Sequence, residues 1–242
     1  MKFGLFIVAR NGSVRLPKKH LLKYKNVKMI EILISRVLKT KKINRFILIT
    51  TKKKEDDIFK KITKKMGISI FRGDELNVKK RLYDAARKFK IEKIVLINGD
   101  RPLSDPKIIN YALNIFKRKK LKILTTRLKQ TFPKGFDLDI FTTKKLKESF
   151  EYSKTDDDFE HITNIFFRYK KKFNVYNLHS PKKYFMPKLS YLLDYKKDYH
   201  KIKKLLDEAY KLKKNYFIDC EDIIKISKKL NCIWVSTFCH II

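Results

Sequence analysis

The 242-residue chain has few cysteines, no long apolar run and few acidic residues. Its three cysteines, Cys220, Cys232 and Cys239, are an odd number without a metal-binding spacing, which argues against a disulfide framework or a zinc site and favours free thiols. No apolar run approaches the roughly 18 to 20 residues that span a bilayer, and the first apolar run is too short for a secretory signal. We therefore expect a cytoplasmic protein that does not enter a membrane.

Acidic residues are strongly outnumbered: 25 Asp and Glu stand against 60 Lys and Arg, which gives a net charge of +35. Such a charge is common among nucleic-acid-binding proteins. However, only 11 of the basic residues are arginine, the residue favoured by base readout and by bidentate phosphate contacts, and the 49 lysines are spread along the chain. We expect no specific nucleic-acid binding, although weak association with polyanions at low salt stays open.

Short apolar runs alternate with amphipathic segments along most of the chain. A length of 242 residues with 43% hydrophobic content suffices for one core. Strands are expected at residues 3–9, 46–49, 68–71, 94–97 and 123–126. Their alternation with helical spacing predicts an α/β fold, a three-layer sandwich with a mostly parallel sheet.

The pattern changes after Thr126. Residues 132–141 are expected to be extended and 173–178 to form a strand, so we interpret about 128–180 as an insertion that covers the site or forms a homodimer. Helices are expected at 198–214 and 219–230. Asn26 is a candidate helix cap, and Asp105-Pro106 predicts a cap followed by proline at the first helical position. No linker divides the chain, which indicates one domain over residues 1–242.

The first twenty residues carry the strongest functional signal. The uncharged run Phe3–Ala9 predicts a strand buried on both faces, and it opens into a basic loop at the edge where ligands of parallel sheets bind. Gly12 permits close backbone approach, and Ser13 and the loop N–H groups can donate to phosphate oxygens. Cations that can neutralise a triphosphate are Arg10, Arg15 and Lys19. A nucleotide is the leading ligand hypothesis; the alternative is a basic surface turn.

Acidic residues at two further places are candidates for the site. Asn98-Gly99-Asp100 follows the predicted strand 94–97 at the same edge, where a carboxylate can bind Mg²⁺ and a glycine lets the backbone approach the ligand; the alternative is a turn capped by Asp100. The cluster 156–161 contains Glu160 and His161 and suits metal binding, acid–base work or helix capping. The other histidines, His20, His179, His200 and His240, are interpreted as solvent or packing residues.

The basic loop resembles the A-R-x-G-S-x-R-L-P-G-K loop of the cytidylyltransferases that make CMP-activated acidic sugars, such as acylneuraminate and 3-deoxy-manno-octulosonate cytidylyltransferases, and it is most similar to relatives named after spore coat polysaccharide biosynthesis protein F. Further matches follow in order: Phe71-Arg-Gly73, Val78 to Ala86, Asn98 to Leu103 with Asp105-Pro106, Phe132 to Asp137, Glu160-His-Ile-Thr163, and Leu193-Asp194 with Asp198. Departures are Lys18 in place of a glycine, and Phe159 and Ser190 in place of arginines.

The resemblance implies a nucleotide-diphospho-sugar transferase-like fold and transfer of CMP from CTP to an acidic sugar, with release of pyrophosphate, in surface polysaccharide or glycan precursor synthesis. It implies catalytic roles for Arg10, Arg15, Lys19 and Asp100, and nucleotide contacts from Ala9, Arg10, Asn11, Gly12, Ser13, Arg15, Lys19, Arg72 and Gly99. It implies acceptor contacts from Arg81, Gly135, Asp137, Glu160 and His161, and Mg²⁺ held by Asp100 and Asp194. Other acceptors, namely a phosphonate, a polyol phosphate or a neutral sugar, stay open, as does a non-enzymatic polyanion-binding protein.

Overall fold

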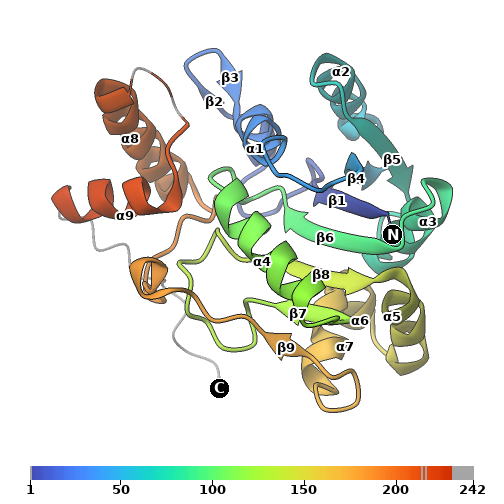
Figure 1. Ribbon diagram of the computed structural model, residues 1–242. Coiled ribbons are helices and arrows are strands. Elements are labelled where there is room, and N and C mark those ends of the chain that lie inside the picture. The colour runs from blue at the N-terminus through green and yellow to red at the C-terminus, as the bar shows by residue number, and fades with distance from the viewer. Residues whose placement is uncertain (1, 214, 216, 231–242) are drawn as a thin grey trace.

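The computed structural model describes residues 2–213, 215 and 217–230, so Cys232, Cys239 and His240 lie outside the described residues. A seven-stranded sheet runs through the centre in the order β5-β4-β1-β6-β8-β7-β9 (Figure 1). The strands are β1 (Phe3–Val8), β4 (Arg45–Thr51), β5 (Ser69–Gly73), β6 (Lys93–Asn98), β7 (Ile123–Thr125), β8 (Asp139–Thr142) and β9 (Tyr176–Asn177). Only β8 pairs antiparallel, with β6 and β7, so the prediction of a mostly parallel sheet is confirmed.

Helices cover both faces of this sheet, which makes the predicted three-layer sandwich. One face carries α1 (Met29–Val37), α2 (Ile58–Lys65) and α4 (Pro106–Arg118), with α8 (Lys196–Lys213) and α9 (Cys220–Lys229) packed together at its side. The other carries α3 (Val78–Lys88), α5 (Thr143–Glu148), α6 (Asp156–Glu160) and α7 (Ile162–Arg168). Short 3-10 turns are η1 (Lys19–Leu21), η2 (Lys54–Asp56), η3 (Ser149–Tyr152) and η4 (Lys182–Tyr184).

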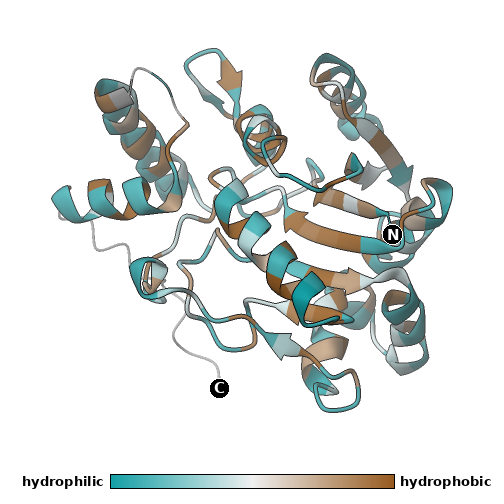
Figure 2. Cartoon of the chain, viewed as in Figure 1, coloured by the Kyte–Doolittle hydropathy of each residue, from teal (hydrophilic) through white to brown (hydrophobic). Residues whose placement is uncertain are grey.

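The alternation of side chains along β1 explains why its sequence has no polar residue. Leu5 and Ile7 pack in the core on the α1 and α4 side, whereas Phe6 packs with Ile47 on the α3 side. All four side chains are fully buried. Successive residues of a strand point to opposite faces, so a strand with a helix layer on each side needs apolar residues at every position. Figure 2 shows this as hydrophobic strands between helices whose outer faces are hydrophilic.

Local capping was predicted correctly at one helix and wrongly at another. The Asp105 carboxylate accepts a hydrogen bond from the Lys107 N–H at 2.7 Å, as expected for the cap of α4, and also accepts from the Cys220 N–H at 2.6 Å, which ties α9 to α4. Asn26 caps nothing, because α1 begins only at Met29 and Lys28 occupies its cap position. Asn26 instead lies between the two-residue strands β2 (Lys23–Tyr24) and β3 (Val27–Lys28).

The segment 128–180 contains β8, α5, α6, α7 and β9. The expected strand at 173–178 is reduced to Tyr176–Asn177, because Asn174 has a positive φ of 46° that turns the chain just before it. The terminal helices fall close to the predicted ranges, as α8 and α9. Cys220 is a buried free thiol, as expected. Within the described part of the chain, no helix combines the length and apolar character that a membrane span requires. The homodimer stays a prediction.

Candidate active site

A cavity of about 390 Å³ opens at the carboxyl ends of β1 and β6. Most of the residues singled out in the sequence line it: Ala9, Arg10, Gly12, Ser13, Arg15, Lys19, Arg81, Gly99, Asp100, Glu160 and His161. Parallel strands bring their carboxyl ends to one edge, which is why the loop after β1 and the turn after β6 face the same space. The sequence prediction that these two segments meet is confirmed.

The basic loop is anchored at its base by Asn11. The Asn11 N–H donates to the Asp56 carboxylate at 2.8 Å, and its side-chain amide donates to the Glu55 carbonyl at 2.7 Å. The Asn11 carbonyl accepts from the Lys18 N–H at 3.2 Å. Asn11 therefore holds the loop and lies outside the cavity lining, and its expected nucleotide contact stays a prediction. Lys18, at the position where the similar proteins have glycine, adopts a left-handed conformation with φ of 54°, the region that glycine enters without strain.

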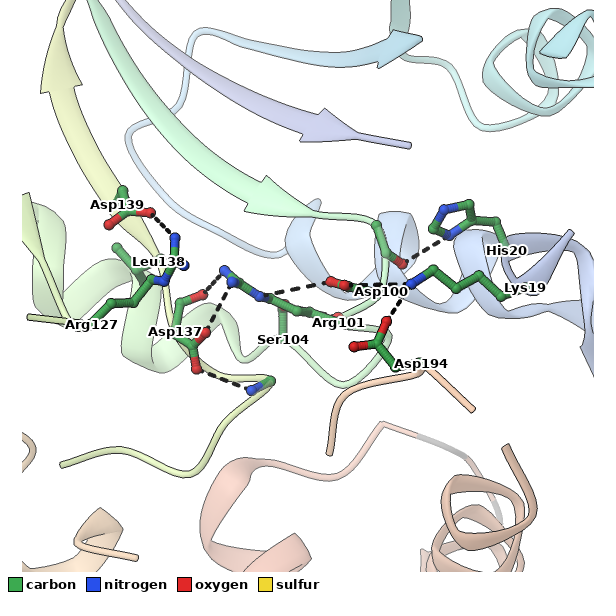
Figure 3. Close-up of polar contacts among 12 residues, drawn as sticks. Lys19, His20, Asp100, Arg101, Ser104, Arg127, Asp137, Leu138, Asp139 and Asp194 are labelled. Carbon is green, nitrogen blue, oxygen red and sulfur yellow. Dashed lines mark hydrogen bonds and ion pairs between the residues drawn. The ribbon is translucent and has the colours of Figure 1, made fainter. Parts of the chain in front are cut away.

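Lys19 lies between the two carboxylates proposed from the sequence as metal ligands (Figure 3). Its Nζ is 2.7 Å from Asp194 Oδ1 and 3.6 Å from Asp100 Oδ2. Arg15 Nη2 lies 3.1 Å from Asp194 Oδ2, which raises the pKa of Arg15. Burial would raise the pKa of Asp194, but the hydrogen bonds and charges of Lys19 and Arg15 outweigh it and lower that pKa below its ordinary value. Asp194 thus stays ionised, and it lies with Asp100 within reach of one cation, the Lys19 ammonium.

These carboxylates fit a magnesium ion. Asp100 Oδ1 is buried and makes no hydrogen bond, so one carboxylate oxygen is left for a cation. Mg²⁺ takes oxygen ligands, often one or two carboxylates, and completes its shell with water and phosphate oxygens. In the described residues no group of three or more His, Cys, Asp and Glu gathers, which excludes an all-protein cage there but not such a shared site. Asp198 is not part of it, because its carboxylate accepts the N–H groups of Asp194 and Tyr195 at the start of α8.

His20 forms part of the cavity lining and was missed as a site residue. Its Nδ1 lies 3.2 Å from the Gly99 carbonyl and its ring packs near Phe59, so the packing role expected for it is right. Burial lowers the pKa of His20 to about 4, with a further contribution from Lys19, and keeps the ring neutral near pH 7. A Cβ at position 99 would lie 2.8 Å from His20 Cε1, which gives Gly99 a packing reason beside its expected role.

Three further arginines, Arg10, Arg81 and Arg127, have defined partners, and all three line the cavity. Arg10 Nη2 lies 2.8 Å from Glu160 Oε1, which joins the phosphate loop to α6. Arg81 is buried and donates to the Asp74 carbonyl at 2.8 Å; burial, and then the charge of Arg10, lower its pKa to about 10. Arg127, which sequence reasoning missed, donates to Thr163 at 3.1 Å and pairs with Asp139 at 3.4 Å. Its rarity among the lysines, directly after a strand, is the signal that would have found it.

Three residues expected to bind ligands have structural contacts instead. The Arg72 guanidinium donates to the carbonyls of Thr51 and Lys53 and pairs with Asp57, so it fixes β5 to the segment after β4 and lies outside the cavity lining. Gly135 and Asp137 also lie outside the lining. Asp137 is buried and pairs with Arg101, and Gly135 turns the chain next to it with φ of 97°. The roles that the resemblance implies for these three residues in ligand binding stay predictions.

The fold and the site together define a class of enzyme. A mostly parallel sheet presents a basic loop, Asp100, Arg81 and Arg127 around one cavity, and Asp194, which is outside the lining, pairs with Arg15 and Lys19 of that loop. These are the groups that bind a triphosphate and stabilise the charge that shifts during phosphoryl chemistry. The protein is therefore a nucleotidyltransferase.

Comparison with known proteins gives the family. The chain belongs to the cytidylyltransferase family, whose model matches residues 5–237. It is 27% identical over 214 residues to the spore coat polysaccharide biosynthesis protein SpsF of Bacillus subtilis, covering 85% of this chain and 87% of that protein. A solved cytidylyltransferase from Leptospira borgpetersenii superposes with a TM-score of 0.88 at 28% identity, over all of both chains. A CMP:2-keto-3-deoxy-manno-octonic acid synthetase solved with CTP shares the fold, with a TM-score of 0.66 at 14% identity, over 86% of this chain and all of that one. The chain is thus a CTP-using nucleotidyltransferase.

Proposed function

We propose that this cytidylyltransferase transfers CMP from CTP to an acidic sugar, with Mg²⁺ held by Asp100 and Asp194, in the synthesis of a polysaccharide or glycan precursor. The observation that carries the proposal is that three arginines, Arg10, Arg81 and Arg127, line the same cavity as Asp100. An acceptor carboxylate placed beside them would gain charge-assisted hydrogen bonds that a neutral sugar cannot form. The name of the octonic acid synthetase, which shares the fold, contains an acidic sugar, and the name of SpsF refers to polysaccharide synthesis.

The reaction follows from this placement. A sugar hydroxyl oxygen forms a bond to the α-phosphorus, the bond from that phosphorus to the bridging oxygen of the β-phosphate breaks, pyrophosphate leaves, and the hydroxyl proton passes to solvent. Arg15 and Lys19, which pair with Asp194, would bind the β- and γ-phosphates and the leaving pyrophosphate. Mg²⁺ would neutralise charge on the α-phosphate. Glu160 holds Arg10 toward the cavity.

A screen of pyrophosphate release tests the proposal. Each of the four nucleoside triphosphates is combined with acidic sugars, neutral sugars, polyol phosphates and phosphonates, and we expect release only with CTP and an acidic sugar. Strong pyrophosphate release with a neutral or phosphorylated acceptor would refute the acidic sugar as acceptor and leave nucleotidyl transfer to that other acceptor.

Asp100→Asn is the matched variant, because it keeps the shape of the side chain and removes the charge that Mg²⁺ requires. Turnover should fall by about two or more orders of magnitude while the melting temperature stays within a few degrees. A polyanion-binding protein would instead lose a repulsive carboxylate and bind polyanions slightly better. Turnover of Asp100→Asn near the wild-type value at saturating Mg²⁺ would refute the metal site.

A further inference from the structure

Arg101 is a second cation beside Asp100, and it lies outside the cavity. Its side chain is only 5% exposed and its Nε lies 3.9 Å from Asp100 Oδ1 (Figure 3). Both atoms are buried and neither makes a hydrogen bond. A guanidinium this close to an unbonded carboxylate oxygen is attracted to it and would normally form a hydrogen bond. Another contact must therefore keep the Arg101 guanidinium from bonding Asp100.

Asp137 supplies that contact. Arg101 Nη2 lies 3.0 Å from Asp137 Oδ2 and Nη1 donates to the Asp137 carbonyl at 2.7 Å, so both ends of the fork are taken. The other oxygen of Asp137 accepts from the Gly135 N–H at 3.1 Å, which fixes the carboxylate from behind. Asp137 is itself 7% exposed, and a buried pair of this geometry holds its arginine in one orientation.

The same turn also fixes the second carboxylate of the site. At Gly135, with φ of 97°, a Cβ would lie 2.9 Å from the Tyr191 carbonyl carbon, so only glycine lets the two segments approach. Lys134 and Tyr191 are hydrogen-bonded across this contact at 2.8 Å, and the Leu193 N–H donates to the Asp100 carbonyl at 2.8 Å. Asp194 follows directly. The turn at 134–137 therefore sets the positions of both acidic loops.

We propose that Asp137 is a positioning residue that keeps the Arg101 guanidinium off Asp100, so that Asp100 Oδ1 stays available to the metal. The inference rests on the proposed metal site. Without the Asp137 charge, Arg101 would turn its fork to Asp100 and compete with the ion. The motif residue Asp137 thus serves the metal through Arg101.

The test measures Mn²⁺ affinity of the protein–CTP complex without acceptor, from the electron paramagnetic resonance signal of the free ion, against CTP alone. Asp137→Asn, which can still accept from Gly135, should weaken Mn²⁺ binding about tenfold or more. Arg101→Met should bind Mn²⁺ as tightly as wild type or more tightly. The double variant Arg101→Met/Asp137→Asn should return to within about threefold of wild type, because the competing cation is gone.

Matched outcomes separate positioning from simple damage to the fold. Asp158→Asn removes another buried carboxylate from an arginine, Arg168 at 3.0 Å, and should leave Mn²⁺ affinity unchanged. A double variant as weak as Asp137→Asn, a tenfold weaker Arg101→Met, or wild-type affinity in Asp137→Asn would each overturn the inference while the metal site stands. If Asp137→Asn does not fold, the Mn²⁺ affinity of Arg101→Met still tests whether Arg101 competes with the metal. A wild-type complex that binds Mn²⁺ no better than CTP alone would refute the metal site and this inference together.

Discussion

Replacing Lys19 by methionine should affect catalysis and metal binding in opposite directions. The ammonium bonds Asp194 at 2.7 Å and lies 3.6 Å from Asp100, and its side chain is 10% exposed. Methionine keeps much of the length and apolar volume of the stem and removes only the charge. In the presence of CTP the variant lacks a phosphate contact, whereas in its absence the two carboxylates lose the cation that competes with the metal.

The expected size follows from one charge-assisted hydrogen bond, about 1.5 to 3 kcal/mol, so kcat/KM should fall about 10- to 150-fold. Mn²⁺ affinity of the nucleotide-free variant should rise. The pKa of Asp194, lowered in the native protein by Lys19 and Arg15 against the effect of burial, should rise as well, which carboxyl ¹³C NMR titration measures. A kcat/KM within twofold of wild type, or a weaker Mn²⁺ affinity without nucleotide, would refute this assignment of Lys19.

Two further predictions concern stability. Burial lowers the pKa of His20 to about 4, below its ordinary value, so the free energy of unfolding should fall by roughly 3 kcal/mol as the pH falls from about 6.5 toward 4. Urea denaturation across this pH range measures the loss. A His20→Asn variant whose free energy of unfolding falls equally with pH would contradict the prediction. Gly135→Ala should destabilise the protein by about 2 to 3 kcal/mol, because it combines a positive φ with a Cβ clash, whereas Gly67→Ala, with φ of 66° and nothing within 4 Å, should cost about 1 kcal/mol; equal melting temperatures would contradict the clash.

The parts of the fold that could be predicted from the sequence are those that depend on a residue and its near neighbours in the chain. A run such as Leu5 to Ile7 has to be buried on both faces, and the Asp105 carboxylate reaches the N–H groups of its own helix. Asn26, like Asp105, has a short side chain with an oxygen that can accept from a helix N–H. It does not cap a helix because a hairpin of two-residue strands precedes α1, and strands that short show no hydrophobic periodicity in the sequence.

The site shows the same division. The loop and Asp100 were placed correctly because the ends of parallel strands meet at one edge. Arg72 and Arg127 each follow or end a strand, and nothing local says which of them faces the cavity; that depends on Asp57 binding the first and Asp139 the second. Gly135 and Asp137 were recognised as a motif, but Tyr191 and Arg101 are remote in sequence, so the backbone contact of Gly135 and the ion pair of Asp137 were not predictable.

The distribution of the 11 arginines explains how a chain with a net charge of +35 keeps a specific site. Arginines that line the cavity are Arg10, Arg15, Arg81 and Arg127. Arginines that bind a carbonyl or a carboxylate to hold a loop or helix are Arg36, Arg72, Arg101 and Arg168. A guanidinium has a planar fork that fixes direction, whereas an ammonium is a hydrated point charge that tolerates many directions. Lysine therefore raises the charge of the surface without competing for these geometries. Lys19, which lines the cavity, has an ammonium that bonds Asp194 and lies near Asp100, and we expect it to exchange Asp194 for a phosphate when CTP binds.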